Sequence, residues 1–140
     1  MKVSLLTASL LLILTGVAAA QGPQGAVERT YSAPMDRVWS ATEAVLKHLG
    51  WDLDKTDRNF GLITTDSRRV DGENYGVYEK ALRHRLRLQV KAQGTERTTV
   101  SVERTLFKRE RILFVDKDEP VMSPDQNVEK ALLDAIGKAL

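Results

Sequence analysis

One stretch of the sequence, Arg83–Ala92, alternates between apolar and polar residues without a break. Strict alternation over this length predicts a β-strand that has one face against a core and one face toward solvent. Strands of that kind belong to antiparallel sheets, which can leave one face open. The core-facing set is His84, Leu86, Leu88, Val90 and Ala92, and the opposite face carries Arg83, Arg85, Arg87 and Lys91.

Two amphipathic helices are expected to cover that sheet on one side. Residues 34–49 place apolar side chains at three- and four-residue spacing, and Gly50 follows as a suitable helix end. Residues 123–126 (Ser-Pro-Asp-Gln) match a capping box with Ser123 as the N-cap, and an apolar stripe then runs from Val128 to Leu140. The two stripes predict two helices on the same face of the sheet.

The other predicted strands are short, and two segments have no clear period. The strands are Ala26–Tyr31, Trp51–Asp54, Leu62–Thr65 and Thr98–Glu103, the middle two forming a hairpin. Val70–Leu82 is rich in glycine and predicts a long loop or an irregular edge. Arg111–Val115 predicts a last strand or a strand extension, and Asp116–Glu119 a polar turn. The expected fold is therefore α+β, an antiparallel sheet in the order β-α-β-β-β-β-α with two helices packed on one face.

The N-terminus has the pattern of a secretory signal peptide. Lys2 supplies a positive charge, residues 3–17 are largely apolar, and residues 18–20 are three alanines. A membrane anchor is the alternative, but the apolar run is shorter than the roughly 20 residues that span a bilayer. We expect cleavage after Ala20, a flexible segment over residues 21–25, a single domain over residues 26–140, a periplasmic location and no membrane span in the mature form.

Composition excludes several classes of function. The chain contains no cysteine, which rules out disulfides, thiol catalysis and cysteine-based metal sites. Its net charge of +2 gives no electrostatic case for a nucleic-acid partner. Asp52 and Asp54 alternate on one strand face and could act as an acid-base pair or hold a cation, but nothing nearby predicts the cleft that catalysis needs, which favours a solvated strand face. His48 and His84 lack metal-ligand spacing. We therefore expect no cofactor, no metal and no enzymatic activity.

Several short motifs resemble a known bacterial family. The residues that carry the likeness are 31–39, 46–51, 57–65 and the closing helix over 129–140. They are similar to the helix-grip domain of the lipoprotein C subunit of the bacterial β-barrel assembly machinery, and to small exported bacterial proteins built on that plan. The resemblance implies a helix-grip-like fold and a periplasmic binding or accessory module. It brings no catalytic residues, and the lipidated cysteine and second domain of that subunit have no counterpart here.

Two groups of residues are candidates for binding. Arg83, Arg85, Arg87 and Lys91 form a basic strand face that could dock an anionic envelope surface or an acidic protein, although charge runs are usually just solvated. Tyr75 and Tyr78 lie in the glycine-rich segment, where aromatic side chains often take part in recognition. The leading hypothesis is an exported, non-enzymatic envelope protein that binds a partner. The alternative is a small-ligand carrier with a pocket between helix and sheet.

Overall fold

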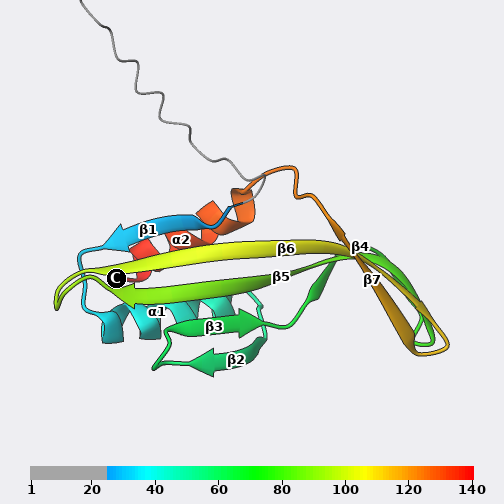
Figure 1. Cartoon of the computed structure of the whole chain (residues 1–140), viewed down its shortest axis with the longest axis horizontal. Coiled ribbons are helices and arrows are strands. Elements are labelled where there is room, and N and C mark those ends of the chain that lie inside the picture. Colours follow the sequence, from blue (N-terminus) through cyan, green and yellow to red (C-terminus); the bar gives the residue numbers. More distant parts are fainter. Residues whose placement is uncertain (1–24) are drawn as a thin grey trace, which may run out of the picture.

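The computed structural model describes residues 25–140, which form seven strands and two helices (Figure 1). In chain order the elements are β1 (Val27–Tyr31), α1 (Met35–His48), β2 (Leu53–Asp57), β3 (Leu62–Thr65), β4 (Arg68–Asn74), β5 (Tyr78–Ala92), β6 (Thr98–Ile112), β7 (Val115–Val121) and α2 (Asn127–Ala139). The predicted signal peptide and its cleavage site lie outside the described residues. The fold class is α+β, as the sequence predicts.

All seven strands belong to one antiparallel sheet built around a long central hairpin. The order is β1-β6-β5-β3-β2, and β4 and β7 add to β5 and β6 at the far end. The β5–β6 pairing is continuous over fifteen residues a strand, from Tyr78 opposite Ile112 to Ala92 opposite Thr98. Both helices pack on one face of the core half, while the other half extends past them (Figure 1). We call this second half, which comprises β4, β7 and residues 78–83 and 106–112, the β-arm.

The core lies between the two helices and the sheet. The alternation predicted for β5 is confirmed at His84, Leu86, Leu88 and Val90, which are buried, but Ala92 at the strand end is exposed. Fully enclosed side chains from every layer meet here: Val38, Leu46, Ile63, Leu88, Val100, Val102, Leu133 and Ile136. Gly50 ends α1 with a φ of +82°, the left-handed conformation predicted for it.

The prediction of a long loop over Val70–Leu82 is wrong, and only its alternative of an irregular edge is confirmed. The segment is the β4–β5 hairpin, and β4 is an edge strand whose pairing with β5 shifts register between Arg69 and Asp71. The prediction of a polar turn over Asp116–Glu119 is also wrong, because these residues lie in β7. Both strands lack a buried apolar face, so the alternation that identifies strands elsewhere is missing from them.

The second helix begins later than predicted. It starts at Asn127 rather than next to Ser123, so the capping box does not form. The Ser123 hydroxyl instead donates to the carbonyl of Asp125 at 2.7 Å, and the Asp125 carboxylate accepts from the Asn127 amide at 3.0 Å. A local turn of side chain-to-backbone bonds therefore competes successfully with the first helical turn.

Trp39 and Trp51 should each be essential to stability, because they are only 4% and 3% exposed in the core. Replacing either by alanine is expected to lower the free energy of unfolding by about 3–5 kcal/mol, as a lost aromatic side chain and an unfilled cavity would. Urea unfolding measures this. Phe60→Ala is the control, since Phe60 is 76% exposed and should unfold like the parent. A tryptophan variant with parental stability would contradict the described packing.

Candidate functional site at the end of the β-arm

The β-arm contains few buried apolar side chains, namely Ala81, Leu106 and Phe107, and most of its side-chain contacts are between charges. Successive partners on β6 and β7 have opposite signs at four positions in a row. These pairs are Lys108 with Glu119, Arg109 with Asp118, Glu110 with Lys117 and Arg111 with Asp116. Opposite charges that face one another across two strands favour that pairing, although solvent weakens the effect where the side chains are exposed. Together the four pairs favour one register in the arm even though no helix covers it.

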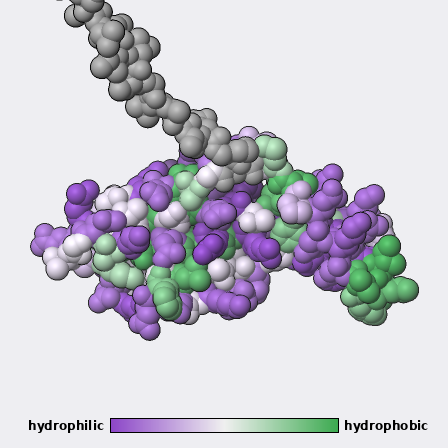
Figure 2. All heavy atoms as spheres, in the orientation of Figure 1, coloured by the Kyte–Doolittle hydropathy of each residue, from purple (hydrophilic) through white to green (hydrophobic). Residues whose placement is uncertain are grey.

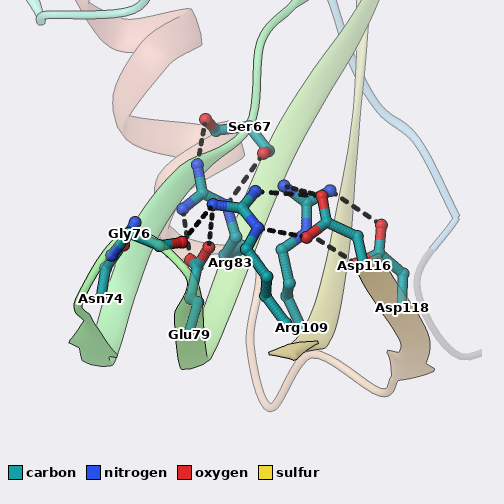
Figure 3. A network of polar contacts seen from close by, with 9 residues as sticks. Ser67, Asn74, Gly76, Glu79, Arg83, Arg109, Asp116 and Asp118 are labelled. Atoms are coloured by element: carbon teal, nitrogen blue, oxygen red, sulfur yellow. Dashed lines mark hydrogen bonds and ion pairs between the residues drawn. The ribbon is translucent and has the colours of Figure 1, made fainter. Parts of the chain in front are cut away.

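A buried carboxylate anchors this charge network (Figure 3). It lies on the face of the arm that continues the sheet face opposite the two helices, which we call the helix-free face. Glu79 is 1% exposed, and its Oε1 lies 2.7 Å from an Arg83 nitrogen while its Oε2 lies 3.6 Å from one of Arg111. Arg111 also binds Asp116, with 2.5 Å between Nε and Oδ1, and this bond lowers the pKa of Asp116. Arg83 donates further to the hydroxyl and carbonyl of Ser67, at 3.0 and 2.9 Å. These contacts fix the arm against the core.

The predicted basic residues share one face of β5, and three of them, Arg85, Arg87 and Lys91, are exposed there, while Arg83 is half-buried. Their role in binding an anionic partner stays a prediction. The guanidinium of Arg83 forms an ion pair with Glu79. The guanidinium of Arg85 lies 5.3 Å from the ring of Phe107, and Arg87 lies opposite Glu103. A hollow of about 630 Å³ over this face is lined by both cations and carboxylates: Arg85, Arg87, Asp54, Asp66 and Glu103. Lys91, exposed near the strand end, is not among the lining residues.

Tyr75 and Tyr78 lie in a row of apolar side chains across the end of the arm, in which Tyr75 directly follows β4 and the other members belong to β5, β6 and β7. Tyr78 is opposite Ile112, and Ile112 is opposite Val115, so these three share a face of the sheet. The Tyr75 amide donates to the Tyr78 carbonyl at 2.7 Å, and the two rings stack with centroids 6.4 Å apart. All four side chains are exposed, from 40% for Tyr78 to 70% for Val115.

Beyond this row, Leu113 and Phe114 form the two-residue turn between β6 and β7. Each is 75% exposed, and their φ angles are +51° and +68°. Turns with positive φ at both positions favour Asn-Gly, and a bulky residue in this conformation costs roughly 1–2 kcal/mol. Backbone strain of this kind typically marks a functional position.

We define the apolar tip as the row and the turns together: Tyr75, Val77, Tyr78, Ile112, Leu113, Phe114 and Val115. All seven are at least 40% exposed, and an apolar cluster is visible at the end of the polar arm (Figure 2). Single exposed apolar side chains are ordinary on a protein surface, whereas a cluster of them often marks a binding site.

The sequence interpretation selects the two tyrosines as candidates but not Leu113 and Phe114, because it predicts a last strand or a strand extension over Arg111–Val115. A signal for the hairpin is nevertheless present. Charges on either side of the turn mirror one another with opposite sign, so that residues 108–111 (Lys-Arg-Glu-Arg) complement residues 116–119 (Asp-Lys-Asp-Glu). Folding the chain back at Leu113–Phe114 pairs all four.

His84 occupies a second polar cluster where the core meets the β-arm. Its ring lies 4.7 Å from that of Trp51, and the Nε of Arg68 donates to its Nε2 at 3.2 Å. Burial, together with the charges of Arg68 and Arg104, lowers the pKa of His84 to about 4. Arg104 also pairs with the buried carboxylate of Glu129 at 2.9 Å, which connects β6 to α2. The imidazole is therefore neutral at pH 7 and serves the packing.

The remaining candidates for chemistry are not brought together. Asp54 lines the hollow on the helix-free face, whereas Asp52 is not among its lining residues. Within residues 25–140, no group of three or more histidine, aspartate or glutamate side chains could hold a metal ion. In the same range, neither helix has the length and apolar character needed to cross a bilayer.

Acid should destabilise the protein through His84. A histidine in an unfolded chain has a pKa near 6.5, whereas that of folded His84 is about 4. Between these two pH values the unfolded state binds a proton that the folded state does not bind. The free energy of unfolding should fall across this window as the pH is lowered. Urea unfolding at pH 7 and at about pH 4.5 should show a smaller loss in His84→Gln than in wild type. His48 is exposed, so His48→Gln serves as the control. If wild type and both variants lose the same free energy of unfolding in acid, the effect does not come from His84.

Relieving the strained turn should stabilise the protein. The double substitution Leu113→Asn with Phe114→Gly installs the dipeptide that positive φ angles favour, and should raise the free energy of unfolding by about 1–3 kcal/mol. Leu113→Ala with Phe114→Ala removes the same apolar groups without relieving the strain, and should give no increase. Thermal and urea unfolding of the three proteins measures both effects. An Asn-Gly variant no more stable than wild type would contradict the strain.

Comparison with known proteins assigns no family. No protein-family model matches the chain, and no curated protein does. Among solved structures, the chain is similar to a TBP-like protein from Parabacteroides distasonis ATCC 8503, with a TM-score of 0.48 and 11% identity over 86% of this chain and 97% of that one. A likeness at this level carries no argument about function, and the resemblance to the lipoprotein C subunit stays a prediction.

Proposed function

We propose that this protein is an exported, non-enzymatic binding module of the bacterial envelope, and that the apolar tip is its recognition surface. The observation that carries the proposal is the turn at Leu113 and Phe114, where two bulky apolar side chains are 75% exposed in a strained backbone conformation. A turn selected for stability would use Asn-Gly. Retaining leucine and phenylalanine there makes sense if their side chains contact a partner.

The packing of the core favours a binding module over a small-ligand carrier. A carrier needs a cavity of several hundred Å³ lined by apolar groups. The space between helices and sheet is instead filled by side chains such as Leu46, Leu88 and Leu133, which have no exposed surface. The hollows described, of about 310, 400 and 630 Å³, lie over the β-arm, around residues 122–130 and over the helix-free face.

Export and the envelope location are supported by the sequence. The positive residue, apolar run and small-residue end of residues 1–20 have the order that signal peptidase substrates share. The absence of cysteine is compatible with an oxidising compartment, since no thiol would be open to unwanted pairing there. The resemblance to a periplasmic accessory domain agrees with the same location.

Site-specific photo-crosslinking in the native cells tests the tip as the recognition surface. A photoreactive phenylalanine analogue placed at Phe114 should form adducts, because this side chain would contact the partner directly. The matched control is the same analogue at Phe60, which is equally exposed, at 76% against 75%, but lies in the β2–β3 turn. Adducts at position 114 that are absent at position 60 are expected. No adducts at 114, or equal adducts at both positions, would refute the proposal.

A further inference from the structure

We infer that the partner of the apolar tip is the surface of a phospholipid bilayer, into which the tip inserts to a shallow depth. This inference rests on the proposed function, since it names the class of partner for the same surface. Three features carry it: the order of side chains along the arm, the shape of the tip and the balance of the charges behind it.

Side chains along the arm change in the order that a membrane interface requires. Leu113 and Phe114 lie outermost, then comes the row that contains Tyr75 and Tyr78, and charged rows begin with Arg111 and its partners. One residue of each strand, Ile112 or Val115, separates the turn from the first charged row, so Leu113 lies two residue steps, or about 7 Å, from Arg111. Interfacial segments bury their apolar part about 5–10 Å deep, and tyrosine prefers the headgroup level. The arm matches both requirements.

The shape of the tip also suits a bilayer better than a protein surface. The tip is the far end of a projecting arm, and it is convex rather than hollowed (Figure 2). A bilayer can surround such an end on all sides, whereas a protein would need a deep apolar groove to cover it. The two turns also form one unit, because Arg111 donates to the carbonyl of Gly76 at 3.4 Å and binds Asp116 across the next strand. The tip can therefore insert without first becoming ordered.

The charges behind the tip nearly cancel. The row Glu73, Lys80, Glu110 and Lys117 carries two charges of each sign. The row Asn74, Glu79, Arg111 and Asp116 carries one cation and two anions. With no local excess of cations, attraction to anionic lipid is not available, and apolar insertion must provide the affinity. Binding should therefore occur on zwitterionic lipid and be insensitive to salt, unlike binding through Arg85, Arg87 and Lys91.

Depth-sensitive fluorescence on vesicles of pure phosphatidylcholine tests the inference in the full chain. Because the chain has no cysteine, Phe114→Cys and Phe60→Cys each provide one labelling site for an environment-sensitive dye. We expect a blue shift and quenching by brominated lipid tails for the dye at position 114, and neither change at position 60. This signal reports the tip itself, whatever the N-terminal segment does. A dye at position 114 that stays in water would overturn the inference.

Partitioning of unlabelled variants provides the second measurement. Phe114→Ser should weaken binding to phosphatidylcholine vesicles by about tenfold to a hundredfold, the loss expected for one buried aromatic side chain, and Phe60→Ser should not. Arg85→Glu with Arg87→Glu should bind like wild type, and neither added salt nor anionic lipid should change affinity more than about twofold. A steep salt dependence, or loss of binding only in the double charge reversal, would overturn the inference in favour of the basic face.

The two proposals fail in different ways. If position 114 forms adducts in cells but the labelled tip ignores vesicles, the tip recognises a protein, so the lipid inference falls and the proposed function stands. If position 114 forms no adducts and the tip ignores vesicles, both fall. Adducts of lipid mass at position 114, together with vesicle insertion, support both.

Discussion

The continuous pairing of β5 with β6 is the interaction on which the rest of the structure depends. Fifteen residues from each strand pair without interruption, so one rigid hairpin serves both the core and the β-arm. At one end the helices cover it and apolar packing stabilises it. At the other end only the short strands β4 and β7 flank it, and cross-strand charge pairs contribute most of the side-chain contacts. The location of the apolar tip follows from the length of this hairpin.

The hairpin changes its buried face where the core ends. In the core half the even-numbered residues of β5, such as Leu86 and Leu88, point toward the helices. In the arm the odd-numbered Glu79 and Ala81 are the buried ones, on the face that is open over the core. The change occurs near His84, beside the register shift in β4. A charged network can therefore be enclosed within the arm while the end of the arm remains exposed.

How much the sequence predicts depends on which force stabilises each segment. Apolar burial leaves a period, so the α1 stripe, the Trp51–Thr65 hairpin and the alternation in β5 could all be predicted. Charge pairing leaves no such period, and β4 and β7 were therefore interpreted as loop and turn. Tyr75 and Tyr78 could be identified as binding candidates from residue type alone. The apolar tip as a unit could not, because it depends on pairing between Tyr78 and Ile112 across 34 residues of chain.

The central claim is that this chain keeps a strained apolar turn because the turn binds, at the expense of stability. The most direct measurement is to determine unfolding free energy and partitioning onto phosphatidylcholine vesicles on one protein, the Leu113→Asn, Phe114→Gly double variant. The account predicts that the two quantities change in opposite directions: the free energy of unfolding rises, and binding to the vesicles weakens at least about tenfold. A variant that gains stability yet binds as well as wild type, or that loses both, would contradict it.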